Sequence, residues 1–268
     1  MPKLTNRLPS FEGVAAGATA TLRMPLGRTY ERLNLSYSGV TLAQLKEIRL
    51  IGNGKTMMRW VGAELINVMN KFDRMEAAAG ILVLNFVRHG MMTKIGIEET
   101  AIGTGVPATE KFPVTLSTLQ LEVDIDAAAT APVLSATSIE TAPQPLGMIR
   151  KIRTFNHSPT AAGEYEIANL PKGDLIARII FKTSNLNSLR IERDNRVIFE
   201  RTKAENELLQ KNGKRTPQDG YFIYDPSEEG YATEALVTAN VQDLRFILNM
   251  AAADNIQVTV EYLGYLER

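Results

Sequence analysis

The chain has 268 residues, of which 30 are lysine or arginine and 30 are aspartate or glutamate. At roughly 150 residues per domain this length favours two domains, and the balanced charge argues against a protein that binds polyanions. Cysteine is absent, which excludes disulfides, thiolate metal sites and a cysteine nucleophile. The N-terminus lacks the apolar stretch of a signal peptide, and no apolar run reaches the roughly 18 residues of a membrane span. We therefore expect a soluble, globular chain.

Strands dominate the predicted elements. Apolar and polar residues alternate with a period of two in three segments, which is typical of half-buried strands: 33–37, 119–126 and 256–262. Shorter apolar runs predict further, more buried strands at 48–51, 81–87, 175–181, 189–191, 221–224 and 244–248.

Helices are expected to be few and short. The clearest covers 202–212, where Thr202 and Glu205 form a capping box and Asn212-Gly213 provides a left-handed stop. Apolar residues from Val61 to Phe72 recur at helical spacing and predict a second helix. A third is expected at about 233–241.

The two halves of the chain resemble each other in pattern. When Pro25 is placed on Pro171, Gly27 falls on Gly173, and apolar residues of the following strands coincide. Each half then continues with a strand, a polar turn, a helix, an apolar strand and a closing alternating strand. We interpret the chain as two copies of one β-rich unit.

Residues 127–147 are rich in alanine, threonine, serine and proline without periodicity, which predicts an extended connection between domains. The predicted domains are residues 1–141, with an N-terminal arm and the linker, and residues 142–268. Each has the size and strand spacing of an antiparallel sandwich. The predicted fold is mainly β: a double jelly roll of two tandem eight-stranded barrels with a few short helices.

The segment Gly52-Asn53-Gly54-Lys55-Thr56 ends like a phosphate-binding loop, but that motif requires glycine where Arg49 stands. Asn53-Gly54 between apolar runs instead predicts a hairpin with a type I′ turn. Likewise, Gly103-Thr104-Gly105 lacks the third glycine of a dinucleotide fingerprint and is interpreted as a loop. The residues predicted to form structural turns are Pro25, Gly27, Asn53, Gly54, Pro171 and Gly173.

No catalytic or metal-binding constellation is recognisable, so no catalytic or cofactor-binding residue is assigned. His89 and His157 are the only histidines, too few for a histidine-rich metal site, and both are interpreted as structural or surface residues. Asp124 and Asp126 share one face of a strand. They fit a solvated face better than an acid–base pair, although carboxylates there would also suit calcium. The Glu228-Glu229 pair is interpreted in the same way.

Two basic stretches are candidates for contact with nucleic acid. The first is Arg150-Lys151-x-Arg153, for which a weak role near lipid head groups or a genome is left open. In the second, four arginines between 190 and 201 alternate with acidic residues, which indicates a salt-bridged face. With no net positive charge, sequence-specific nucleic-acid binding is not expected.

Eight short strings and Pro132, spread over most of the chain in one order, form a recognisable set: Val14-Ala15-Ala16-Gly17, Pro25-Leu26-Gly27-Arg28-Thr29-Tyr30-Glu31, Tyr37-Ser38-Gly39-Val40-Thr41, Asp124-Ile125-Asp126-Ala127-Ala128-Ala129, Pro132, Leu134-Ser135-Ala136, Glu166-Ile167-Ala168-Asn169-Leu170-Pro171, Gln242-Asp243-Leu244-Arg245 and Val260-Glu261-Tyr262-Leu263-Gly264. Through these strings the chain resembles the major capsid proteins of corticoviruses, tailless icosahedral phages with an internal membrane. Residues 91–117 carry no part of this resemblance.

The resemblance implies a double jelly roll that assembles as a pseudo-hexagonal homotrimer. It implies that neighbouring trimers tile a shell, assembled in the host cytoplasm, over an internal lipid membrane and a DNA genome. Other virion proteins would occupy the vertices and the membrane. The family also suggests calcium as a structural ion of the shell, with no ligand residues identified here. No enzymatic activity is expected.

The alternative function is a β-sandwich module that binds carbohydrate or a receptor. Such sites usually stack several aromatic rings on the ligand, whereas Trp60 is the only tryptophan of this chain. A hydrolase on the same scaffold would need an acid–base constellation that the sequence does not contain.

Overall fold

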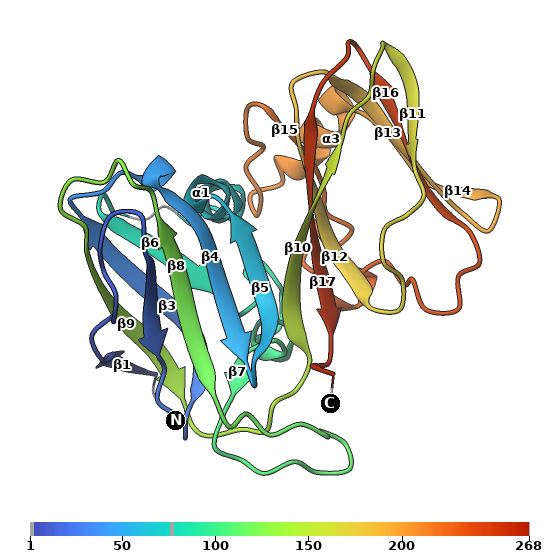
Figure 1. Cartoon of the computed structure of the whole chain (residues 1–268). Coiled ribbons are helices and arrows are strands. Elements are labelled where there is room, and N and C mark those ends of the chain that lie inside the picture. Colours follow the sequence, from blue (N-terminus) through green and yellow to red (C-terminus); the bar gives the residue numbers. More distant parts are fainter. Residues whose placement is uncertain (1–2, 76–77, 268) are drawn as a thin grey trace.

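Two β-sandwiches stand side by side in the computed structural model, which describes residues 3–75 and 78–267 (Figure 1). The strands of the first sandwich are β1 (Leu4–Arg7), β2 (Thr19–Arg23), β3 (Thr29–Ser38), β4 (Leu45–Gly52), β5 (Lys55–Val61), β6 (Ile81–Asn85), β7 (Ile102–Gly103), β8 (Leu119–Ile125) and β9 (Val133–Thr141). Those of the second are β10 (Ile149–His157), β11 (Gly163–Ile167), β12 (Leu175–Lys182), β13 (Leu186–Arg193), β14 (Arg196–Thr202), β15 (Tyr221–Tyr224), β16 (Leu244–Met250) and β17 (Ile256–Gly264).

Helical segments connect some of these strands. The α-helices are α1 (Ala63–Phe72), α2 (Lys94–Glu98) and α3 (Lys203–Gln210), and the 3-10 turns are η1 (Leu42–Gln44) and η2 (Ala232–Glu234). Helix α3 begins at the predicted cap: the Thr202 hydroxyl accepts a hydrogen bond from the backbone N–H of Glu205, and the Glu205 side chain bonds back to Thr202. In each barrel a helix follows the second strand of a hairpin, α1 after β5 and α3 after β14.

The two barrels have the same strand order. In the first, β6-β3-β9-β1 packs on β5-β4-β8-β2, and in the second, β15-β12-β17-β10 packs on β14-β13-β16-β11. Strands β1 to β6 therefore correspond to β10 to β15, and β8 and β9 to β16 and β17. Apolar side chains from both sheets fill each sandwich, for example Leu33 and Leu121 in the first and Ile179 and Phe246 in the second. This arrangement is a double jelly roll, as the sequence predicted.

One sheet runs through both barrels. Strand β5, at the edge of the first barrel, lies parallel to β10 at the edge of the second, with Met58 opposite Ile152. The resulting sheet has the order β15-β12-β17-β10-β5-β4-β8-β2. The two barrels thus share one sheet. The division into domains at residue 141 stays a prediction.

Two predicted elements are wrong. The expected linker at 127–147 contains β9, which pairs with both β1 and β3 in the centre of a sheet. Its inward residues include Ala136, Ser138 and Glu140, and these small and polar side chains hide the period of two. The third helix, expected at 233–241, is limited to η2 because Leu236 exchanges both backbone hydrogen bonds with Ile176 instead.

The N-terminal arm is part of the first barrel in the described residues. The sequence predicts an arm before the first barrel, whereas β1 pairs with β9 from Leu4 opposite Glu140 to Arg7 opposite Thr137. Met1 and Pro2 lie outside the described residues.

Candidate functional site

The predicted glycine turns occupy the same corner of each barrel. Gly27 and Gly173 precede β3 and β12 with φ angles of 106° and 114°, in the region that favours glycine. The Gly27 N–H donates to the hydroxyl of Thr104 at 2.9 Å, and this hydroxyl donates to the Arg28 carbonyl at 2.6 Å. The corner is thus closed by a buried threonine that sequence reasoning missed.

The second barrel repeats this corner. The Gly173 N–H donates to the Thr238 hydroxyl at 2.8 Å, and that hydroxyl donates to the Asp174 carbonyl at 2.5 Å. Pro25 and Pro171 each lie two residues before the corner glycine. Two identical hydrogen-bond pairs at equivalent positions indicate that the barrels are copies of one unit.

A β-bulge follows at the same place in both copies. The register of β3 against β9 shifts between Tyr30 and Arg32, and that of β12 against β17 shifts between Ile176 and Arg178. These positions coincide when Gly27 is placed on Gly173. A bulge re-aims the side chain beside it, and in the second barrel that side chain is Arg178.

The hairpin tips also correspond. Asn53 and Gly54 join β4 to β5 with φ angles of 51° and 75°, and Asp194 and Asn195 join β13 to β14 with φ angles of 49° and 62°. Two successive positive φ angles are those of a type I′ turn. The Asn53 side chain also accepts hydrogen bonds from the backbone of Ser117 and Thr118, which fixes the returning loop to the hairpin.

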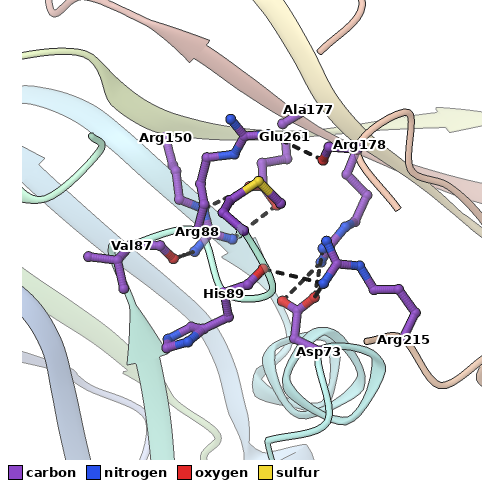
Figure 2. Close-up of a pocket in the computed structure, with 11 residues that line it drawn as sticks. Asp73, Val87, Arg88, His89, Arg150, Ala177, Arg178, Arg215 and Glu261 are labelled. Atoms are coloured by element: carbon purple, nitrogen blue, oxygen red, sulfur yellow. Dashed lines mark hydrogen bonds and ion pairs between the residues drawn. The ribbon is translucent and has the colours of Figure 1, made fainter. Parts of the chain in front are cut away.

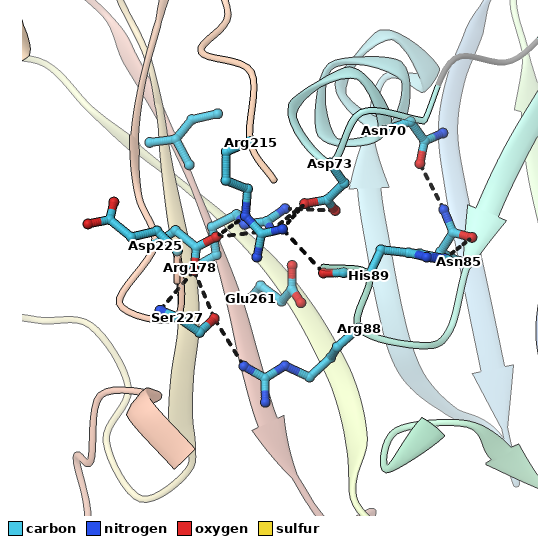
Figure 3. A network of polar contacts seen from close by, with 12 residues as sticks. Asn70, Asp73, Asn85, Arg88, His89, Arg178, Arg215, Asp225, Ser227 and Glu261 are labelled. Carbon is cyan, nitrogen blue, oxygen red and sulfur yellow. Dashed lines mark hydrogen bonds and ion pairs between the residues drawn. The ribbon is translucent and has the colours of Figure 1, made fainter. Parts of the chain in front are cut away.

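A buried ionic network joins the barrels (Figure 3). Arg178 of β12 contacts Asp73, at the end of α1, at 2.7 Å and Asp225 at 3.4 Å. Arg215 contacts the same two carboxylates, with 2.7 Å to Asp225 and 3.4 Å to Asp73. Both guanidinium groups also lie against the ring of Phe72, at 4.8 and 5.7 Å from its centroid. The first barrel therefore provides a carboxylate and an aromatic ring to two arginines of the second.

A second group of contacts lies beside the first. Arg150 of β10 binds both oxygens of Glu261 at 2.8 and 2.9 Å and donates to the carbonyl of Asn85 at 2.6 Å. Arg88, from the first barrel, binds Glu99 at 2.6 Å and donates to the Ser227 hydroxyl at 3.2 Å. Hydrogen bonds therefore cross the interface from both barrels.

The charges of this network are balanced: four arginines (Arg88, Arg150, Arg178 and Arg215) face four carboxylates (Asp73, Glu99, Asp225 and Glu261). Burial raises the pKa of Asp225, but Arg178 and Arg215 more than offset this effect and hold it below its ordinary value. Glu261 behaves alike, because Arg150 and Arg178 outweigh burial and lower its pKa. Both carboxylates are therefore ionised at neutral pH.

The space among these side chains is small. Figure 2 shows the arginines and carboxylates converging on a cavity of about 10 Å³. A volume of this size holds about one water molecule. The side chains of the network therefore pack closely against one another where the two barrels meet.

Comparisons with known proteins identify the family. Residues 5–142 match the model of the viral coat protein P2 N-terminal domain, and residues 149–266 match that of its C-terminal domain. The major capsid protein P2 of Pseudoalteromonas phage PM2 is 30% identical over 97% of each chain. The chain belongs to the viral coat protein P2 family.

Solved structures agree with the family assignment. The crystal structure of P2 from bacteriophage PM2 superposes with a TM-score of 0.91 at 26% identity, over 100% of this coat protein and 99% of that chain. The STIV MCP matches with a TM-score of 0.72 at 10% identity, over 98% and 97% of the two chains. At that identity the second match speaks for the fold alone.

The three basic residues between 150 and 153 of this coat protein differ in burial and in their partners. Arg150 is buried in the ionic network, and Lys151 binds Asp174 at 2.8 Å. Only Arg153 of the three is exposed. Arg150 is therefore not available to lipid head groups or a genome, because a charge inside a strand marks an internal ion pair here.

The two predicted aspartates lie on a salt-bridged face. Asp124 binds the Arg49 guanidinium through both oxygens at 2.9 and 3.0 Å, and Asp126 binds Lys46 at 2.6 Å. Lys46 lowers the pKa of Asp126. The second basic stretch also forms ion pairs, for example Arg190 with Glu192 at 3.1 Å and Arg201 with Glu228 at 2.7 Å.

The histidines lie in different environments. His89, beside the ionic network, bonds through Nε2 to the Asn85 side-chain oxygen at 3.0 Å. Burial lowers its pKa to about 4 against the opposing effect of Asp73, so the ring is neutral at pH 7. His157 lies edge-on to Tyr165. Within residues 3–75 and 78–267, no group of three or more histidine, aspartate or glutamate side chains is placed to hold a metal ion.

Two further findings bear on partners. Trp60 is buried in the core of the first barrel, so its ring is not presented to a ligand. Among the described residues, no helix combines the length and the hydrophobicity that a bilayer-spanning helix requires.

Proposed function

We propose that this coat protein assembles as trimers that tile the facets of an icosahedral capsid. The observation that carries the proposal is the fixed placement of two equivalent barrels, joined by a continuous sheet and a buried ionic network. Three such subunits in a ring present six near-equivalent barrels, and a unit of this shape tiles a plane. Membership of the viral coat protein P2 family supports the same role.

The proposal extends to the surroundings of the shell. We place the trimers over an internal lipid membrane and a DNA genome, in contact with vertex proteins and membrane-associated virion proteins. Assembly in the host cytoplasm and a purely structural, non-enzymatic role belong to the same proposal. Contact with the genome would be independent of base sequence, since the charge of the chain is balanced.

Calcium as a structural ion also remains a proposal. Within one copy the acidic residues of the described segments do not gather into a cation site. A calcium ion would therefore need backbone carbonyls or carboxylates from a neighbouring copy, since calcium takes six to eight oxygen ligands. The contacts between subunits are the place to test for it.

Light scattering on a sizing column tests the trimer directly. The chain has a mass of 29.6 kDa, so we expect a species of three times this mass for the purified protein. The measurement is made with calcium and repeated with a chelator. Loss of the trimer on chelation would support calcium between subunits, whereas a monomer in both conditions would contradict the proposed assembly.

The alternative, a module that binds carbohydrate or a receptor, gains no support from the described residues. Its best stacking residue, Trp60, is 2% exposed. Titration with glycans followed by tryptophan fluorescence should therefore leave the emission unchanged.

A further inference from the structure

The contact between the barrels within one chain has a defined edge on each side. The β5 edge presents Met58 opposite Ile152 of β10, in parallel orientation. The preceding residue, Met57, is the bulge residue of β5 and is 2% exposed. It lines a groove together with Ile149 and Leu266 of the second barrel. Joining the barrels thus covers an apolar strand edge.

The second barrel carries the same edge in β14. Its bulge lies at the corresponding place, because β4–β5 pairing shifts between Leu50 and Ile51 and β13–β14 pairing shifts between Ile191 and Glu192. When the two hairpin turns are superposed, Ile198 corresponds to Met57 and Phe199 to Met58. The two edges are therefore equivalent in backbone as well as in sequence position.

This second edge is uncovered in a single chain. In the described residues β14 pairs with β13 alone and forms the end of its sheet. Ile198 is 39% exposed, although its counterpart Met57 is 2% exposed. Its neighbour Val197 is 53% exposed. The helix that follows, α3, leaves Leu208 71% exposed, whereas α1 at the same place contacts the second barrel through Phe72. An exposed, apolar strand edge is a pairing surface.

The complementary edge is also free. Strand β1 corresponds to β10, because β1 pairs with β9 as β10 pairs with β17. When β9 is superposed on β17, Ile139 coincides with Glu261. Thr5 pairs with Ile139 and Ile152 pairs with Glu261, so Thr5 of β1 corresponds to Ile152 of β10. In the described residues β1 pairs with β9 alone, and Leu4 to Arg7 are exposed. One chain therefore has both halves of a contact that it already makes once internally.

We propose that β14 of one copy docks on β1 of the next copy in parallel, with Phe199 opposite Thr5. The partner is thus a second copy of this chain, and the contact repeats the internal β5–β10 contact. Such a head-to-tail contact generates a ring when its rotation closes. The inference rests on the proposed trimer and names the edges that form it.

A charge at the exposed edge tests the contact. Ile198→Glu introduces a carboxylate into the proposed interface, and we expect the trimer to dissociate to monomers at concentrations where the wild type is trimeric. The matched control is Val133→Glu, which changes another exposed residue at the far end of β9 from the β1 pairing and should stay trimeric. Because both sites are exposed, we expect both variants to fold. Circular dichroism spectra and melting temperatures check this.

Cross-linking provides an independent readout because the chain has no cysteine. In the double variant Thr5→Cys, Ile198→Cys, a short bismaleimide should join copies into covalent trimers on a denaturing gel. The pair Thr5→Cys, Val133→Cys should remain monomeric. A trimeric wild type with neither dissociation by Ile198→Glu nor cross-linking at 5 and 198 would overturn this interface and leave the proposed trimer intact. A monomeric wild type, together with a Thr5→Cys, Ile198→Cys variant that stays uncross-linked, would overturn both.

Discussion

Arg32 and Arg178 follow the same β-bulge in the two barrels, yet they serve different contacts. Arg32 donates to the side chain of Asn85 within its own barrel at 3.2 Å. Arg178 is buried against Asp73 of the other barrel. The comparison shows that the backbone of the repeated unit is retained while the same position specialises according to what covers it.

The largest effect is expected from removing the buried arginine. Arg178→Met leaves Asp73 and Asp225 with less compensating charge, and breaking a buried ion pair costs about 3–5 kcal/mol. We expect a loss of this size in the free energy of unfolding, measured by denaturant titration at neutral pH. The control is Arg190→Met, whose partly exposed ion pair with Glu192 should be worth less than about 1 kcal/mol. Equal losses in both variants would mean that the network does not hold the barrels together.

The pH dependence of stability tests the neutral His89. Its pKa is lowered to about 4 in the folded chain, against 6.5 as the ordinary value, so the unfolded state binds more protons between these values. Its contribution is complete above pH 6.5 and is lost as the pH falls toward 4. Converted at 1.36 kcal/mol per pH unit, the loss is about 3 kcal/mol.

His89→Gln should flatten the stability profile between pH 6.5 and 4. Below that window the variant should follow the slope of the wild type, because Asp225 and Glu261, whose pKa values are lowered in the folded chain, lose their stabilisation below their ordinary pKa values in both proteins. Denaturant midpoints measured at half-unit steps of pH separate the two windows. An identical slope in the variant and the wild type would assign the loss to other groups.

Removing the repeated corner should affect both barrels alike. Thr104→Val and Thr238→Val each leave a glycine N–H without its hydroxyl acceptor, and a buried polar group without its partner costs about 1–3 kcal/mol. We expect similar losses in thermal or denaturant unfolding for the two variants. Serine at either position keeps the hydroxyl and should retain most of the stability. A large difference in stability between the two valine variants would show that the two corners contribute unequally to the stability of the chain.

The smallest effects are expected at the hairpin tips. Gly54→Ala places a side chain at a φ angle of 75°, which should cost about 1 kcal/mol. Asn195→Gly relieves the equivalent position of the other hairpin, whose φ angle is 62°, and should be neutral or slightly stabilising. Denaturant titration of each variant and of the wild type measures the change in the free energy of unfolding. A Gly54→Ala variant more stable than the wild type would contradict the expectation.

Local chemistry made part of the fold predictable from sequence. The capping box at Thr202 and the Asn53-Gly54 turn depend only on residues close together in the sequence. Segment 119–126 alternates strictly between apolar and polar residues. Strand β9 escaped because Ser138 and Glu140 point inward, so its pattern does not separate apolar from polar faces.

The ionic network could not be predicted from the sequence, because its partners are far apart along the chain. Asp73 and Arg178 meet across 105 residues of chain, and no local pattern pairs them. The only signal is a charge inside an apolar strand, as at Arg178, which indicates that a buried partner exists without naming it. The resemblance to a capsid family identified the fold but could not assign these contacts.

The placement of Phe72 and Asp73 has a consequence for biosynthesis. Both residues leave the ribosome before Arg178 and Arg215 are made, and domains generally fold in order of synthesis. During that interval the first barrel carries a ring and a carboxylate that later become buried against the second barrel. Nascent chains stalled at residue 148 should therefore bind chaperones more strongly than full-length chains, as crosslinking on the ribosome would show. Translation of the second barrel thus completes the surface of the first, so a chain interrupted midway is an aggregation hazard within the cell.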